Sequence, residues 1–563
     1  MEHGELPTCL RKANGGKESA KSVSMNFQFT LGNPKIRTTC YWAIVVFAAL
    51  LRVLSLDRVP LGFWYDEAFY SLNALSIGRN HWPIFFVLDG HPAEPLFIYS
   101  LAAFFKLFGS TVFVARLHSA VWGTALVALM YPFAKRVVGE RWALLACLVT
   151  AVFRWPLHFS RTVFRAILPP VFVLLVVIFF LRWREKRRLS DAVLCGASMG
   201  AGLYTYLSFR LVPLLWLGWV AWLWWRGEIR WRHDWRGLAT IVFTCLIVFA
   251  PLGWDYLRNP MHFTGRMDEV SMFRKNVEIR QPDGSIKTEV LPKTPGEVVR
   301  DLASNAWAIV KMWTIRGDHV ARHNLPHEPV FDWASGIVFY FGFVWCLWQA
   351  GRNEFAFLLP WWVVVFSLAS VFSFGAPNIL RMQGMIPAVV VIYVLGLRTL
   401  YELAVHWLRQ PVRVLLISSL VVLFLVLQLD SYFRRFAQSP EMRREFLYDT
   451  FYKPALQVRG IAPQVNSVYV PADLGHHLTF RFLTHEVQNL QYYTVDADLP
   501  TTAPRHFAIV TTVPTISAAQ ERGRDLLAWL RRLRAEHHST VPILVESATG
   551  TTEVPWTEVW VVR

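Results

Sequence analysis

Two acidic sites follow the first long apolar run of this sequence. Asp66 and Glu67 lie in the segment 62–70, and Glu94 lies between Pro92 and Pro95 in the stretch that leads to the next long apolar run. Carboxylates can act as a general base, position a substrate or ligate a cation. Because prolines flank Glu94 and both acids belong to one loop, we expect Asp66 and Glu94 to face a shared catalytic pocket.

A purely structural role for Asp66 stays open. Residues 68–75 have the apolar spacing of a short amphipathic helix at the membrane interface. An acid in the first turn of such a helix can simply accept its free N–H groups, and capping acids are common. The second carboxylate, Glu94, favours a site instead.

Metal binding is a further interpretation of the same loop. Asp66, His91 and Glu94 offer the oxygen and imidazole donors that suit a divalent ion. Their spacing matches no closed metal motif, however, and a loop histidine next to proline is commonly structural. The sequence thus leaves a divalent metal ion open as a cofactor and indicates no other.

Arginines at the ends of apolar runs form a second group. Each arginine could extend its guanidinium group to the lipid headgroups by snorkelling, and this arrangement would require no ligand. Several on the face that holds the acids favour recognition of an anion, most simply a phosphate held by planar guanidinium forks. The residues that we expect to bind substrate, through its anionic group or through another part of it, are Glu67, Arg161, Arg165, Arg210 and Arg381.

Composition places these residues in a membrane protein. The 563-residue chain is 54% hydrophobic and 15% aromatic, with a mean hydropathy of +0.33, which exceeds what a soluble surface tolerates. Its apolar runs approach the roughly 20 residues that cross a bilayer. They predict an α-helical polytopic protein with about eleven spans, near residues 39–57, 113–134, 142–159, 164–181, 192–207, 211–225, 238–257, 332–350, 355–374, 385–401 and 412–430.

The basic residues orient these spans. The net charge of +17 is spread over short loops and is not gathered into a patch with exposed aromatics, so it does not indicate nucleic-acid binding. Lys and Arg gather in cytoplasmic loops, which predicts a cytoplasmic N-terminus and an extracytoplasmic C-terminus. If segment 95–108 were a span, the basic clusters 135–141 and 182–188 would move to the side opposite the basic N-terminal tail. We therefore expect this segment to lie at the outer interface or to re-enter the membrane.

Three regions follow from this topology. Residues 1–38 are predicted to be a disordered cytoplasmic tail, and residues 39–430 the transmembrane domain, with an outer catalytic loop at 58–112 and a second outer loop at 258–331. Residues 431–563 combine apolar strands, at 467–470 and 507–510, with a helical run at 518–534. This pattern predicts an extracytoplasmic α/β domain.

Short motifs add a family resemblance. The Asp66-Glu67 pair, the segment 91–99 around Glu94, the run 107–120 and Phe159-Ser160-Arg161 resemble the protein mannosyltransferase and aminoarabinose transferase superfamily of GT-C type glycosyltransferases. This resemblance covers roughly residues 40–260. Segments 316–318, 322–326 and 377–381 resemble bacterial members of the same group.

The resemblance implies an inverting transfer of a hexose or pentose from a polyprenyl-phosphate donor to a hydroxyl of a protein, lipid or glycan. The reaction would take place on the outer face of a bacterial plasma membrane. The family's catalytic acid maps onto Asp66, and the acid of the aminoarabinose enzymes' Glu-Lys-Pro segment maps onto Glu94. The Lys of that segment is absent here, because Pro95 follows Glu94 directly. Another cation must then meet the phosphate.

The chemistry of the leaving group agrees with this interpretation. A departing phosphate is a stable anion that needs no proton, so one general base suffices, and we expect Asp66 to be that base. A flippase or transporter of lipid-linked sugars is the alternative, since it would share the spans and the outer arginines. It would also favour polar residues deep within its spans, whereas the predicted spans are largely free of acids. Sugar transfer from a labelled donor separates the two.

Overall fold

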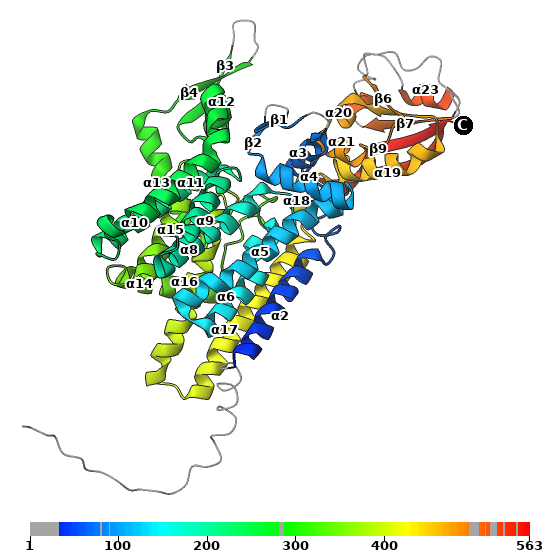
Figure 1. The fold of residues 1–563 in the computed structure, drawn as a ribbon. Helices are drawn as coiled ribbons and strands as arrows, with labels where there is room; N and C mark the ends of the chain where they lie inside the picture. Colours follow the sequence, from blue (N-terminus) through cyan, green and yellow to red (C-terminus); the bar gives the residue numbers. More distant parts are fainter. Residues whose placement is uncertain are drawn as a thin grey trace, which may run out of the picture.

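Long helices run side by side through the body of the computed structural model, and smaller elements gather at one end (Figure 1). The structure describes residues 33–78, 81–88, 91–280, 286–494, 506–512, 514–517, 526–532, 535–547 and 550–562. Residues 1–32 of the expected tail, and residues 518–525 and 533–534 of the expected C-terminal helical run, lie outside this part of the chain.

Eight helical segments in the described residues are long and apolar enough to cross a membrane, and each coincides with a predicted span. The chain is an integral, multi-pass membrane protein. The main helices of these segments are α2 (Pro34–Val53), α5 (Val112–Val138), α8 (Leu168–Lys186), α10 (Val212–Trp225), α11 (Trp231–Arg258), α15 (Glu354–Val371), α16 (Ile386–Leu403) and α17 (Gln410–Asp430). The three other predicted spans correspond to the shorter helices α6 (Glu140–Val152), α9 (Leu189–Gly202) and α14 (Trp333–Gln349).

The predicted span 142–159 is not one helix. Helix α6 ends at Val152, Phe153 is non-helical (φ −56°, ψ 117°), and the short α7 (Arg154–Phe159) follows. Arg154 donates from Nη1 to Oε1 of Glu328 at 2.6 Å and from Nη2 to the carbonyl of Pro329 at 2.7 Å. This pairing joins the break to the second outer loop, a long-range contact that apolar periodicity does not reveal.

Segment 95–108 forms α4 (Leu96–Phe108), which is apolar but has only 13 residues. A helix of that length spans about 20 Å, less than the roughly 30 Å hydrocarbon core. Phe97, Ile98 and Leu101 are buried, whereas Leu107 and Phe108 at its end are exposed. This agrees with the expectation that the segment does not cross the membrane.

The two predicted outer loops fold into small elements at the same end of the helical body (Figure 1). The first loop contains α3 (Tyr65–Ser76), α4 and the antiparallel pair β1 (Phe86–Leu88) and β2 (His91–Ala93). The second contains α12 (Pro260–Val270), the hairpin of β3 (Arg274–Arg280) and β4 (Ile286–Pro292), and α13 (Pro295–Met312). The short amphipathic helix predicted after Asp66 is thus confirmed as α3.

The C-terminal region contains a five-stranded sheet in the order β6-β5-β7-β9-β8. Its strands are β5 (Ser467–Pro471), β6 (Leu490–Tyr493), β7 (Phe507–Thr512), β8 (Glu536–Ser547) and β9 (Gly550–Val562), and its helices are α19 (Lys453–Ile461), α20 (Ala472–Gly475), α21 (Leu478–Leu483) and α23 (Leu526–Arg532). Strand β5 runs parallel to β6 and β7, while β9 is antiparallel to β7 and β8. The predicted α/β character and both predicted strands are confirmed.

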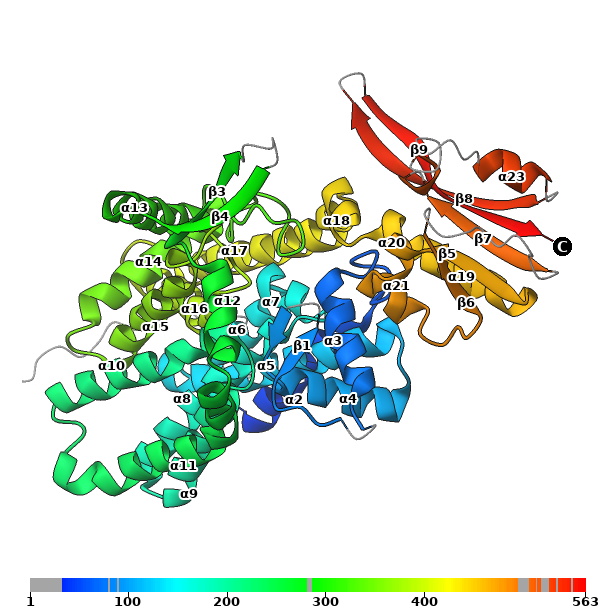
Figure 2. The same cartoon turned by 90° about the horizontal axis from the view of Figure 1, so that it is seen from above.

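This C-terminal region packs against the start of α3 (Figure 2). Phe63 stacks on Phe482 with ring centroids 5.1 Å apart, and its carbonyl accepts a hydrogen bond from Thr479 Oγ1 at 3.1 Å. The Phe63 N–H donates to the carbonyl of Phe446 at 2.9 Å. Gly62 has φ +83°, and a Cβ there would lie 2.2 Å from that same carbonyl oxygen. Only glycine fits this position without strain, and the entry to α3 is therefore held tightly.

Candidate active site

Glu67 is in the first turn of α3, and its side chain is buried in the core. Arg116 of α5 holds it through two contacts, Nε to Oε1 at 3.1 Å and Nη2 to Oε2 at 3.2 Å, and both side chains are 0% exposed. The backbone N–H of Val163 donates to Oε1 at 3.0 Å, and that of Trp64 to Oε2 at 2.9 Å. Arg116 also donates to the carbonyls of residues 56, 60 and 62. A saturated pair of this kind positions the loop, so the expectation that Glu67 contacts substrate does not match its surroundings.

Asp66 has a different environment, although it is the next residue along the chain. It is half-buried in the first turn of α3. Glu67, not Asp66, accepts from the N-cap backbone N–H at Trp64. Among the described residues, the Asp66 side chain makes no hydrogen bond or ion pair. The capping role considered for Asp66 thus falls to its neighbour, and the Asp66 carboxylate is free to meet a ligand.

Glu94 lies buried after β2 and joins two of the predicted arginines. Arg165 pairs with Glu94 Oε2 through Nη1 and also donates to the carbonyl of Pro92 at 3.3 Å. Arg210 Nη2 lies 3.5 Å from Glu94 Oε1. The structure thus brings Glu94, Arg165 and Arg210 together, although they lie far apart in the sequence. One carboxylate facing two guanidinium groups leaves a surplus of positive charge.

Three tyrosines surround these arginines. The Arg165 guanidinium carbon lies 5.8 Å from the ring centroid of Tyr70 and 5.3 Å from that of Tyr206. Arg210 lies 5.2 Å from the ring of Tyr256, whose hydroxyl is 3.2 Å from Nη2. Such cation–π contacts fix the arginines without neutralising them. Burial raises the pKa of Tyr70, which lies in α3 outside the spanning helices, so its phenol stays protonated as a donor.

Asp66 belongs to the same electrostatic neighbourhood. Its carboxylate interacts electrostatically with the guanidinium groups of Arg165 and of Arg266 in α12, and with the phenol of Tyr70. Arg266 pairs with Glu269 at 2.6 Å on its own helix. The site therefore draws on α3, the β2 end, the start of α8 and the second outer loop.

Arg381 approaches this group from the loop before α16. It donates from Nη1 to the carbonyl of Phe374 at 2.9 Å, and no carboxylate of the described residues pairs with it. Arg266 and Tyr206 both act on its charge. Its position agrees with the expectation that it belongs to the arginine group.

Arg161 does not join this group. Its guanidinium donates to three backbone carbonyls just past or at the end of α2, those of Leu51 (2.6 Å), Ser55 (3.1 Å) and Val59 (3.0 Å). The residue is fully buried, and its guanidinium lies over the ring of Phe433 at 5.1 Å. Because these three carbonyls engage both Nη1 and Nη2, Arg161 stabilises the end of α2, and the expectation that it contacts a substrate phosphate does not match this placement.

Of the three suggested metal ligands, Glu94 is already paired with arginines, and the side chain of His91 lies outside the part of the chain that the structure describes. Both oxygens of Glu94 face arginines, and a cation placed there would meet their positive charge. Within the described part of the chain, no three His, Cys, Asp or Glu side chains form a group that could hold a metal ion. We therefore derive no chemical step through a metal.

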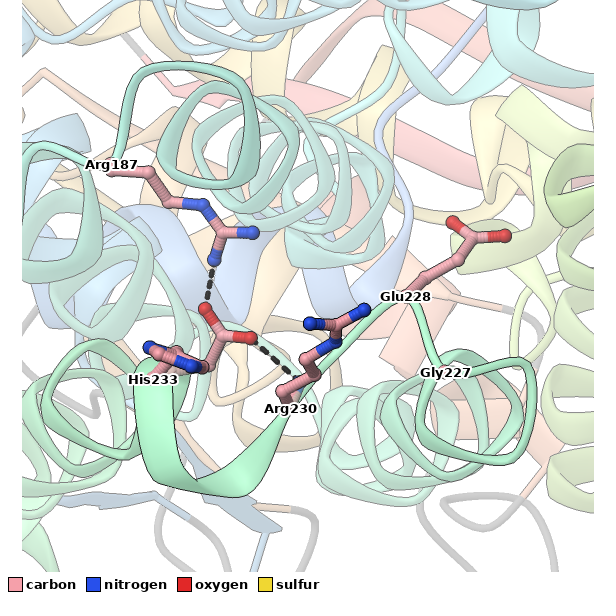
Figure 3. A pocket seen from close by; sticks show the side chains of 6 residues that line it. Arg187, Gly227, Glu228, Arg230 and His233 are labelled. Atoms are coloured by element: carbon pink, nitrogen blue, oxygen red, sulfur yellow. Dashed lines mark hydrogen bonds and ion pairs between the residues drawn. The ribbon is translucent and has the colours of Figure 1, made fainter.

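An open surface pocket lies at the other end of α8, far from Asp66. It has a volume of about 510 Å³, and the 19 residues of α8 place it about 28 Å from Arg165. Arg187, which Figure 3 labels, pairs with Asp234, and Asp234 also accepts a hydrogen bond from the backbone N–H of Arg230 at 2.8 Å. Because its buried acid is already paired, this pocket lacks the open carboxylate that catalysis needs. The candidate site is therefore located by the chemistry of Asp66 and not by this pocket.

The sequence did not single out Tyr70, Tyr206, Tyr256 or Arg266. Tyr70 follows Asp66 by one helical turn, a spacing that places both on one face of α3 and could have identified it. Arg266 lies in the long second outer loop, which charge counting leaves out, and no local motif marks it. Only the fold of α12 over the first loop brings it near Asp66.

Comparison with known proteins supports the resemblance seen in the motifs. Residues 90–254 match the family described as dolichyl-phosphate-mannose-protein mannosyltransferase. The crystal structure of ArnT from Cupriavidus metallidurans bound to undecaprenyl phosphate aligns with 93% of this chain and 98% of its own, with a TM-score of 0.53 and 14% identity. The chain has the ArnT fold. The fold that the resemblance implies is confirmed.

Other comparisons give the following results. ArnT from the same organism in the apo state also has a TM-score of 0.53, at 15% identity over 93% of this chain and 98% of that one. The archaeal oligosaccharyltransferase AglB from Archaeoglobus fulgidus, in complex with an inhibitory peptide and a dolichol-phosphate, has a TM-score of 0.47 at 11% identity, over 92% of this chain and 74% of that one. No curated protein matches the sequence.

Proposed function

We propose that this protein transfers a sugar from a polyprenyl-phosphate donor to a hydroxyl acceptor, with inversion, and that Asp66 is the general base. The observation that carries the proposal is the half-buried Asp66 carboxylate, which has no partner among the described residues and acts on the charges of Arg165 and Arg266. The mannosyltransferase match and the ArnT fold support this reaction class.

In this reaction the acceptor oxygen attacks the anomeric carbon from the face opposite the phosphate. Asp66 accepts the hydroxyl proton as the new C–O bond forms, and the bond between the anomeric carbon and the phosphate oxygen breaks. The electron pair of that bond leaves with the polyprenyl phosphate, which stays anionic and needs no proton. The sugar therefore binds between Asp66 and the arginines.

Arg165, Arg210 and Arg381 receive the donor phosphate in this proposal. Glu94 neutralises only part of the charge of Arg165 and Arg210, and no carboxylate of the described residues pairs with Arg381. Preorganised donors of this kind stabilise charge that grows in the transition state. They take the place of the Lys that Pro95 replaces in the motif.

The acceptor enters, in this proposal, from the side of Trp64. Arg322 lies 4.8 Å from the Trp64 ring and pairs with Glu445 of α18 (Pro440–Glu445). A pocket of about 560 Å³ opens there, lined by His319, Arg322, Pro326, Glu441, Arg444 and Glu445. Val320 and Ala321 add an apolar part to this lining, and the charged side chains at its edge suit a hydroxyl-bearing acceptor that approaches from the aqueous side.

The test is sugar transfer by the purified full chain in proteoliposomes. A set of radiolabelled polyprenyl-phosphate sugars is supplied with hydroxyl acceptors of the protein, lipid and glycan classes. The proposal expects label in an acceptor together with an equal amount of released polyprenyl phosphate, and the opposite anomeric configuration in the product. Movement of intact donor across the bilayer without bond cleavage would instead support the transporter alternative.

A further inference from the structure

A groove between α5 and α8 lies at the end of the helical body opposite Asp66. It has a volume of about 460 Å³, and its apolar wall is formed by Leu129, Leu175, Ile178 and Phe179. Its rim is basic and is formed by Lys135, Arg136, Arg182 and Lys186, which lie near the ends of the two helices. An apolar wall that ends in a cationic rim matches the two parts of a phospholipid.

The dimensions of the groove match one leaflet. Leu175 and Lys186 are separated along α8 by about 16 Å, from the 1.5 Å rise per residue of an α-helix. This is close to half of the roughly 30 Å hydrocarbon core. An acyl chain that begins at the rim would therefore end near the middle of the membrane.

Two cations at the rim make no ion pair within the described residues. Glu185 binds Arg136 at 2.7 and 3.0 Å, and Asp191 pairs with Arg182 at 2.9 Å. Lys135 and Lys186 are exposed, and neither makes an ion pair with a carboxylate of the described residues. In the pocket of Figure 3, by contrast, Arg187 is paired with Asp234 and no apolar wall continues into the membrane.

We propose that this groove binds an anionic phospholipid of the leaflet on that side. One acyl chain lies along Leu175, Ile178 and Phe179, and the headgroup phosphate meets Lys135 and Lys186. Basic pockets between membrane helices have the charge and position that select anionic headgroups. This site is independent of the proposed glycosyltransfer, since it lies at the other end of α8.

The experiment measures binding of fluorescent phosphatidylglycerol to the purified full chain in detergent, with phosphatidylcholine of the same chains as reference. The double variant Lys135→Gln/Lys186→Gln should bind phosphatidylglycerol about 10-fold more weakly or worse, from the usual contribution of each interfacial Lys. The matched control, Arg230→Gln/Arg232→Gln, removes two exposed charges from the same end outside the groove and should keep wild-type affinity. The variant Ile178→Trp, which fills the apolar wall, should weaken binding with all charges intact.

Three results would overturn the proposal. Equal losses in the lysine variant and the control would show general surface attraction. Displacement of the lipid by glycerol phosphate would show a site for a free anion that makes no use of the acyl chain. Displacement by undecaprenyl phosphate with no measurable phosphatidylglycerol affinity would assign the groove to the polyprenyl carrier.

Discussion

The two neighbouring acids of the first outer loop, Asp66 and Glu67, lie in opposite environments. Glu67 points into the core, where Arg116 and two backbone N–H groups occupy both of its oxygens. Asp66 stays half-buried without a partner among the described residues, beside arginines whose charge Glu94 only partly offsets. The same contrast separates Arg161, whose donors are used by carbonyls, from Arg165, which faces the group around Asp66.

This difference shows how to distinguish structural charges from functional ones in this fold. A charge whose hydrogen-bonding capacity is filled by protein groups stabilises a loop or a helix end. A charge that the protein leaves incompletely matched is available to a ligand. Substitution of a fully hydrogen-bonded charge should therefore lower stability. Substitution of an incompletely matched charge should lower donor binding or turnover.

The largest effect is expected from breaking the buried pair. Arg116→Met leaves Glu67 charged and unpaired in the core, which should lower the free energy of unfolding by about 3–5 kcal/mol. Thermal unfolding in detergent measures this as a lower Tm and reduced yield. The double variant Glu67→Leu/Arg116→Met removes both charges and should recover part of the loss. The single variant Glu67→Leu completes the cycle. If the loss of stability in the double variant equals the sum of the losses in Glu67→Leu and Arg116→Met, the pair is not coupled as described.

A second contrast compares two arginines four residues apart. Arg165→Gln should weaken binding of undecaprenyl phosphate by about 10- to 100-fold, the range of a lost charge-assisted hydrogen bond. Arg161→Gln should lower the Tm, because three carbonyls lose their donor, while the folded protein keeps its affinity. Binding titration at a temperature where both variants are folded measures the difference. Equal loss of affinity in both variants would indicate that Arg161 also contacts the donor phosphate.

Two glycines on either side of α3 test how its start is held. Gly62→Ala adds a Cβ against the Phe446 carbonyl at a positive φ, and we expect a loss of about 1–3 kcal/mol of stability. Gly78 follows the helix with φ +98° and has nothing within 4 Å of an added Cβ. Gly78→Ala thus carries the backbone strain without the clash, and its Tm should fall less. A larger loss at Gly78 would contradict the close approach at Gly62.

The smallest effect is expected from metal removal. Because arginines face both oxygens of Glu94, we expect EDTA treatment to leave sugar transfer unchanged. Transfer assays before and after chelation, with Mg²⁺ and Mn²⁺ added back, measure this. Loss on chelation and recovery on adding back a metal ion would show that an ion takes part.

Composition and spacing predicted the membrane class, the α/β nature of the C-terminal region and the position of α3. The spans could be read because lipid requires long apolar helices. The sequence placed Glu94, Arg165 and Arg210 on one face but did not indicate that they contact each other, as they do in the structure. The role of Arg161 could not be read, because its acceptors lie more than a hundred residues earlier, at the end of α2.

The break between α6 and α7 shows the same limit. Nothing in the apolar pattern of 142–159 indicates that Arg154 meets Glu328, a residue 174 positions away. Arg266 likewise reaches the site only because α12 folds over the first loop. Local sequence determines which elements form, whereas long-range contacts determine which charges remain open.

The most direct test of the account is turnover by Asp66→Asn. The substitution is nearly isosteric and removes the basicity of a side chain that makes no hydrogen bond within the described residues, so the Tm and the affinity for undecaprenyl phosphate should match the wild type. Under the proposed mechanism, sugar transfer falls by about 100-fold or more, the scale of a lost general base. Near-normal transfer by this folded variant would contradict the assignment of Asp66 as the base.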